Sequence, residues 1–147
     1  MKYYTEEECR GALQRATNTI NELTKRCENY TRGTNDCFAL LAEYDKELRG
    51  STKARDYINF QWKSTREFSI KLARQGYTLG QYMEYCGYQI IMNNKPLLGD
   101  IAFKQGAMIN DGAFWVSTKD DNTGAQQVVQ SHFLETNLVV LARPIRS

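Results

Sequence analysis

A cysteine at the predicted start of a helix is the residue of this chain best placed to do chemistry. Cys37 follows the polar, glycine-containing stretch 31–35 and opens the apolar run Phe38–Leu41. The dipole and free N–H groups of a helix N-terminus stabilise a thiolate, which is the nucleophilic form of cysteine. Because cysteines near helix starts are more often packing residues, this position alone allows both interpretations.

Three further motifs follow Cys37 along the chain. Pro96 and Gly99-Asp100 lead into the predicted apolar strand Ile101–Phe103. The next strand that the pattern predicts is aromatic, at Ala113–Ser117, and the chain closes with the strand-like run 138–142 followed by Arg143.

This order of motifs resembles the NlpC-type papain-like cysteine peptidases. The resemblance covers residues 35–143 and rests on Asp36-Cys37, Pro96 with Gly99-Asp100, the aromatic strand and the closing VVLAR. The long insert between Cys37 and Pro96, which carries Trp62 and Gly76-Tyr77, is similar to a branch found in tailed bacteriophages. The resemblance implies a papain-like α+β fold and cleavage of peptide bonds in peptidoglycan stems.

The resemblance also implies residue roles. Cys37 matches the nucleophile, and a histidine base is expected at the start of the strand that follows the Gly99-Asp100 strand. With Ala113–Ser117 as that strand, the base position holds Asp111. A third polar residue orients the base in the family, and Gln127, or its neighbour Gln126, matches that position.

Aspartate at the base position changes the chemistry. A neutral imidazole can take a thiol proton near pH 7, whereas an aspartate, with a reference pKa of about 3.9, is already anionic. A negative neighbour raises the pKa of a thiol, so we expect Cys37 beside Asp111 to be a poor nucleophile. The only histidine, His132, is predicted to follow the strand Gln127–Gln130 and is the alternative base.

An amphipathic helix is predicted from Thr5 to about Asn29, outside the resemblance. Thr5 and Glu8 form a capping-box pattern, and an apolar stripe follows along one side: Cys9, Leu13, Ala16, Ile20, Leu23 and Cys27. The stripe packs either on its own domain, which we favour, or on a partner, with Tyr3 and Tyr4 as part of a docking element. We divide the chain into this helix, residues 1–30, and an NlpC-like domain, residues 31–147.

The rest of the chain predicts helices first and antiparallel strands after them, which is an α+β arrangement. Helices are expected at Asp36–Leu48, from Ser64 or Thr65 to Gln75, and from a Thr78 cap to Tyr85. An apolar run at Tyr88–Met92 precedes the strands.

Composition excludes several classes of function. The net charge is +2 with basic and acidic residues interleaved, so nucleic acid is not an expected partner. No stretch is long and apolar enough to span a membrane, and no signal peptide is visible, so we expect synthesis in a cytoplasm. The four cysteines are predicted to be thiols, and we expect no metal site and no cofactor.

Three functions therefore stay open. The first is a structural or interaction protein of a bacteriophage particle, within its tail, built on a degenerate NlpC-like domain and contacting other tail proteins in a larger assembly. The second is an active cysteine peptidase that acts on peptidoglycan. The third is an intracellular regulator that binds a host protein through an aromatic surface.

Overall fold

The structure is a computed structural model of the 147-residue chain. It describes residues 2–25, 37–51, 53–58, 65–92, 95–103, 107–120, 126–132 and 140–146, without the side chains of 23–25, 37, 65, 119, 120, 126–132 and 140. The helices in this part of the chain are α1 (Glu6–Lys25), α2 (Cys37–Arg49), α3 (Lys53–Tyr57), α4 (Thr65–Arg74) and α5 (Leu79–Tyr85). The strands are β1 (Tyr88–Ile90), β2 (Ile101–Phe103), β3 (Ala107–Asn110), β4 (Phe114–Asp120), β5 (Gln126–His132) and β6 (Val140–Pro144).

The strands form one sheet in the order β1-β6-β2-β3-β4-β5, with every pair antiparallel. Residues Ile101 to Phe103 pair with β3 on one side and with β6 on the other, so the last strand of the chain lies beside the Gly99-Asp100 strand. Helices that precede an antiparallel sheet confirm the predicted α+β class.

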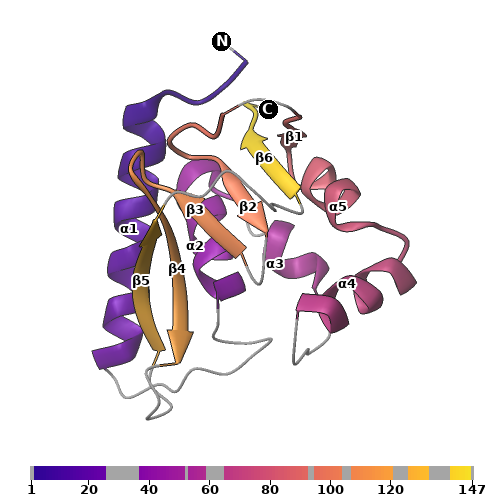
Figure 1. Cartoon of the computed structure of the whole chain (residues 1–147), viewed down its shortest axis with the longest axis horizontal. Coiled ribbons are helices and arrows are strands. Elements are labelled where there is room, and N and C mark those ends of the chain that lie inside the picture. Colours follow the sequence, from indigo (N-terminus) through magenta and orange to yellow (C-terminus); the bar gives the residue numbers. More distant parts are fainter. Residues whose placement is uncertain are drawn as a thin grey trace.

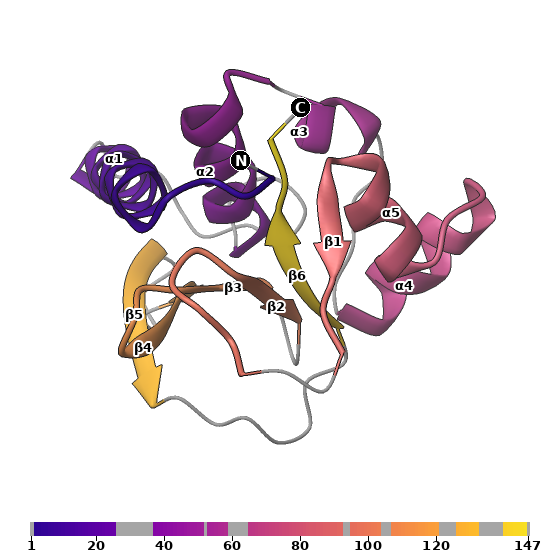
Figure 2. The same ribbon diagram turned by 90° about the horizontal axis from the view of Figure 1, so that it is seen from above.

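Side chains on successive strand residues enter two different apolar clusters. Ile101, Phe103 and Val116 belong to the main core, which also contains the buried residues of the helices. Ala102 and Trp115 belong to a smaller cluster on the other face of the sheet. This alternation follows from the two-residue period of a strand. Figure 2 shows α1 and α2 lying together on one face of the sheet, which is the face of the main core.

Helix α1 begins as its sequence predicts. The backbone N–H of Thr5 donates to the Glu8 carboxylate, and the Glu8 N–H donates to the Thr5 hydroxyl, both at 3.1 Å. The described part of the apolar stripe is buried: Cys9, Leu13, Ala16 and Ile20, together with Ala12. These side chains belong to or contact the core that α2 shares, so the stripe packs on its own domain as favoured. Cys27 and the side chain of Leu23 lie outside the described residues.

Helix α2 contributes a run of buried residues to the main core. Residues 38–42 are buried along with Tyr44, as the apolar run predicts. The helix ends at Gly50, which has a φ of 70° and donates its N–H to the Lys46 carbonyl at 2.7 Å. A positive φ is readily adopted by glycine, so Gly50 acts as the predicted C-terminal stop.

Helices α3, α4 and α5 pack at the β1 end of the sheet, as Figure 1 shows. The predicted Thr78 cap is confirmed, because the Thr78 hydroxyl accepts from the N–H of Gln81 and the Gln81 side chain accepts from the N–H of Thr78. Helix α3 was not predicted. Its five residues, Lys53–Tyr57, are too few to show a helical apolar period.

Two strand predictions are wrong. Strand β3 was missed, because its four residues, Ala-Met-Ile-Asn, contain one β-branched residue and resemble a loop. Strand β5 extends to His132, whereas His132 was predicted to follow the strand. The first error alters the assignment of the candidate site.

Candidate functional site

Cys37 is the first residue of α2, as the sequence predicts for a nucleophile. The helix that it opens contacts α1, β3 and β4 and is buried from Phe38 onward. The side chain of Cys37 lies outside the described residues, so its position at the helix start is the observation that bears on its chemistry.

The Asp111 carboxylate closes the turn between β3 and β4. Its Oδ1 atom accepts from the backbone N–H of Ala113 at 2.9 Å and of Phe114 at 2.7 Å. The adjacent Asn110 is buried, and its side chain accepts from the N–H of Gly112 at 2.7 Å. The two side chains thus satisfy backbone donors that a three-residue turn would otherwise leave unpaired, which is the ordinary use of Asp and Asn in turns.

The position of this turn along α2 separates Asp111 from the helix start. Asn110 exchanges backbone hydrogen bonds with Gly99 and Asp100, and the Gly99 carbonyl accepts from the Tyr44 hydroxyl at 2.9 Å. Tyr44 follows Cys37 by seven residues, which is about 10 Å along a helix axis. The contacts of the turn therefore lead to the second half of α2 and not to Cys37.

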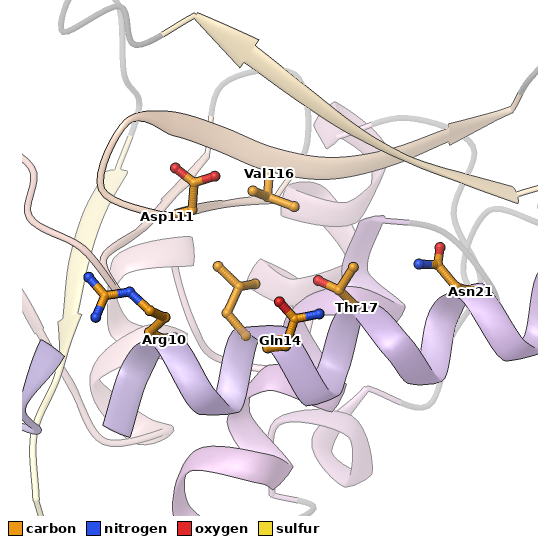
Figure 3. Close-up of a pocket in the computed structure, with 7 residues that line it drawn as sticks. Arg10, Gln14, Thr17, Asn21, Asp111 and Val116 are labelled. Carbon is orange, nitrogen blue, oxygen red and sulfur yellow. The ribbon is translucent and has the colours of Figure 1, made fainter. Parts of the chain in front are cut away.

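Asp111 also lines a groove of about 370 Å³ beside α1. The other lining residues are Arg10, Leu13, Gln14, Thr17, Asn21 and Val116. Figure 3 shows Asp111 above the Arg10 end of the helix and Asn21 at the far end. Four polar side chains of α1 thus face this groove, so Asp111 looks toward a polar surface.

Strand β3 changes the register from which Asp111 was assigned. The strand that follows the Gly99-Asp100 strand is β3, and not the strand that begins near Ala113. The assignment of Asp111 to the base position assumed the later strand, so that register does not hold. Strand β3 opens with Ala107, whose methyl side chain cannot accept a proton, and residues 104–106 lie outside the described residues.

The two remaining candidates lie at opposite ends of β5. The Cα of His132 pairs with that of Phe114, next to the Asp111 turn, and the Cα of Gln127 pairs with that of Lys119. Five residues of β4 separate these positions, which is about 16 Å along a strand. The backbone therefore places His132 next to the Asp111 turn and Gln127 at the other end of the hairpin. Their side chains are not among those described.

By contrast, two motif residues that were assigned no role meet directly. Asp100 and Arg143 form a two-point ion pair, with Oδ1–Nε and Oδ2–Nη2 distances of 2.9 Å. Asp100 is 1% exposed, and its Oδ2 also accepts from the Leu97 N–H at 2.8 Å. Burial raises the pKa of Asp100, and Arg143 and the Leu97 N–H oppose that rise. Hydrogen bonding with Asp100 raises the pKa of Arg143.

Cys9 lies against Gly99, the residue that precedes Asp100. A Cβ atom at Gly99 would lie 2.6 Å from the Cys9 sulfur, and Gly99 has a φ of 94°. Burial raises the pKa of the Cys9 thiol, although its hydrogen bond with Tyr44 acts in the opposite direction. A buried thiol with a raised pKa is a packing residue and not a nucleophile.

A second buried carboxylate was missed. Asp45 is fully buried, and its Oδ1 accepts from Arg49 Nε at 2.9 Å and from the Tyr88 hydroxyl at 2.7 Å. Its Oδ2 has no hydrogen-bond partner among the described residues. Burial raises the pKa of Asp45, and Tyr88 and Arg49 lower it. The spacing of an Asp and an Arg four residues apart in an apolar helix was the available signal.

Arg49 also binds backbone carbonyls before β1 and after β6. Its Nη2 donates to the Gly87 carbonyl at 3.1 Å and its Nη1 donates to the Ile145 carbonyl at 3.4 Å. The Asp45–Arg49 pair therefore fixes the corner before β1 and the residues after β6, which is a structural role.

Neither metal nor membrane chemistry is indicated in the described ranges. Within them, no group of three or more His, Cys, Asp or Glu residues could hold a metal ion. A search of the same residues found no helix long and apolar enough to cross a bilayer. Both findings concern the described part of the chain.

Comparison of the chain with protein-family models, with curated proteins and with solved structures gave no match. Cys37 begins a buried helix, while Asp111 closes a distant turn and the Gln127 backbone lies at the other end of the β-hairpin. The described contacts support turn closure at Asp111.

Proposed function

We propose that this chain is a structural or interaction protein of a bacteriophage particle, within its tail, built on a degenerate NlpC-like, papain-like domain. The sequence resemblance supplies the phage and NlpC parts of the proposal. The observation that carries the proposed loss of catalysis is that β3, the strand that follows the Gly99-Asp100 strand, opens with Ala107, whose methyl side chain cannot act as a base.

The framework of the proposed family is compatible with the sheet. Asp100, from the Pro96 and Gly99-Asp100 motif, pairs with Arg143 from the closing motif, because β2 and β6 are neighbours. A domain that retains these contacts while its catalytic positions diverge can serve as a binding module, since function lies in the site and not in the fold.

Two measurements test this proposal together. Mass spectrometry of purified phage particles should detect the chain at a fixed ratio to tail proteins, and its absence from particles would contradict the structural role. The purified chain should release no more peptide from peptidoglycan than its Cys37→Ala variant does. Activity in the parent that the variant lacks would contradict the degenerate site.

The alternative that one observation favours is an active cysteine peptidase. Cys37 opens α2, where the helix dipole lowers the pKa of a thiol. His132 would have to reach Cys37 as the base, from a backbone position opposite Phe114. Loss of peptide release on both Cys37→Ala and His132→Ala would support this alternative over the structural role.

A further inference from the structure

The first residues of the chain lie against its last ones through an isolated antiparallel bridge. Tyr3 forms an antiparallel bridge with Ile145, and the N–H of Arg146 donates to the Lys2 carbonyl at 2.8 Å. Both marked chain ends lie on the same side of the molecule in Figures 1 and 2. The contact continues the direction of β6 beyond Pro144.

Two adjacent tyrosines of this segment are held by three arginines. The Arg143 guanidinium lies 5.6 Å from the centre of the Tyr3 ring, and the Tyr3 hydroxyl donates to the Gln89 side chain. The guanidinium groups of Arg49 and Arg146 lie 5.9 Å and 4.8 Å from the centre of the Tyr4 ring. These distances are within the range of cation–π attraction.

The tyrosines are thus bound within the chain, and their role in docking on a partner stays a prediction. The surface that receives them has a defined chemistry. That surface offers guanidinium faces for two aromatic rings, an amide acceptor for one hydroxyl and a backbone donor for one carbonyl.

The receiving groups are positioned by contacts that do not involve the tyrosines. Asp100 holds Arg143 at two points, and Asp45 with two backbone carbonyls holds Arg49. Arg146 pairs with Glu8 at the start of α1. Because these contacts hold the three guanidinium groups independently of the tyrosines, the surface is preorganised, which lowers the cost of ordering its side chains on binding.

A pocket beside the segment shows that the surface continues past it. The pocket has a volume of about 220 Å³ and is lined by Tyr3, Tyr4, Glu6, Cys9, Leu97, Leu98, Arg143 and Pro144. Leu97 is 53% exposed, so an apolar side chain of a bound segment has a contact available there.

We propose that this surface is a recognition site for an extended segment with two consecutive aromatic residues, and that residues 2–4 of the chain occupy it as an exchangeable internal ligand. A partner that carries such a segment binds by displacing Tyr3 and Tyr4. The proposal is independent of the particle role, because it concerns a surface and not the site around Cys37.

Residues 2–4 compete with a partner for this surface, and the binding measurement must take account of that competition. Tethering gives residues 2–4 an effective concentration in the millimolar range, so a free peptide competes poorly with them. The full chain with Tyr3→Ser and Tyr4→Ser keeps the backbone but vacates both ring positions. This variant opens the two ring positions, while the Lys2 carbonyl still competes for the N–H of Arg146.

The probe is the peptide Lys-Tyr-Tyr-Thr, titrated into the isotope-labelled double variant and followed by NMR. We expect saturable shifts of the Gln89 side-chain amide and of the Nε–H signals of Arg49, Arg143 and Arg146, with a Kd on the order of 1 mM. The matched peptide Lys-Ser-Ser-Thr should give none of them. The parent chain should bind the tyrosine peptide at least tenfold more weakly, because its own tyrosines compete.

The proposal is overturned if the tyrosine peptide shifts none of these signals, or if the serine peptide or the parent chain binds equally well. Circular dichroism first establishes that the double variant is folded. If it is not, the single variant Tyr4→Ser replaces it, since Tyr3 keeps its contacts. In that variant the peptide should shift the signals of Arg49 and Arg146 alone, and the absence of those shifts overturns the proposal equally.

Discussion

Asp100 and Cys37 come from motifs of the same resemblance, but the structure surrounds them differently. Asp100 has a partner for both oxygen atoms, in Arg143 and the Leu97 N–H, and is almost fully buried. Cys37 opens its helix, while the residue assigned as its base, Asp111, closes a turn whose contacts lead to Tyr44. The ion pair between Asp100 and Arg143 is therefore fully formed. The two positions expected to do chemistry, Cys37 and Asp111, are not linked by the contacts of the turn.

The difference shows which residues a sheet constrains. A buried carboxylate without its cation lowers the free energy of unfolding. The stability of the fold therefore requires that Asp100 and Arg143 remain paired. A thiol at a helix start and a carboxylate in a turn carry no such mutual requirement. A framework can therefore persist while the catalytic positions take other roles.

The largest expected effect comes from removing the cation of the complete pair. Arg143→Met leaves Asp100 buried without its partner, which typically costs about 3–5 kcal/mol of unfolding free energy. Denaturant unfolding monitored by circular dichroism measures this. Arg15→Met, which removes the exposed ion pair with Glu47, is the matched control and should cost less than about 1 kcal/mol. Equal losses of unfolding free energy in the two variants would contradict this difference between the buried pair and the exposed pair.

The pH dependence of that variant sharpens the same point. Without Arg143, the pKa of Asp100 in the folded state lies further above its unfolded value, because burial then acts unopposed. The folded variant binds more protons than its unfolded state between those two values, so its stability falls as pH rises through that window. The deficit relative to the parent should therefore shrink on acidification from pH 7. If the loss of unfolding free energy does not change with pH, the unpaired Asp100 carboxylate is not its cause.

A smaller effect is expected at the Asp111 turn. Asp111→Ala removes the acceptor of two backbone N–H groups and should cost about 1–2 kcal/mol of unfolding free energy. Asp111→Asn keeps an oxygen at that position and should cost less than half as much. Thermal unfolding of both variants distinguishes turn closure from a catalytic role. A turn role fails if Ala and Asn are equally tolerated.

The smallest effect is expected at the buried thiols. Burial raises the pKa of Cys86 to about 12, with the nearby Asp45 acting in the same direction. Because the thiolate is the reactive form, Cys86 in the folded chain should resist iodoacetamide at pH 8 and react only after denaturation. Peptide mass spectrometry measures this. Rapid modification of folded Cys86 would contradict its burial.

Much of the fold could be predicted because local signals were strong. The Thr5–Glu8 and Thr78–Gln81 caps fix two helix starts, and a glycine with positive φ ends α2. The buried strand Ile101–Phe103 was recognised from its apolar run. In each case the residues that determine the element lie within a few positions of one another.

What could not be predicted depends on distant contacts or on short elements. Strand β3 has four residues and becomes a strand by pairing with β2 and β4, so its sequence alone resembles a loop. Missing it shifted the register that assigned Asp111. The pairing of Asp100 with Arg143 spans 43 residues and follows from β6 entering the sheet between β1 and β2.

The most direct test of the central claim is the alkylation rate of Cys37 as a function of pH in the folded chain, with buried Cys86 as the internal reference. If Cys37 has no base, its apparent pKa should lie within about one unit of the ordinary thiol value of about 8.5, and Asp111→Asn should leave it unchanged. A rapidly reacting Cys37 with an apparent pKa of about 6 or below would identify an activated thiolate and contradict the degenerate site.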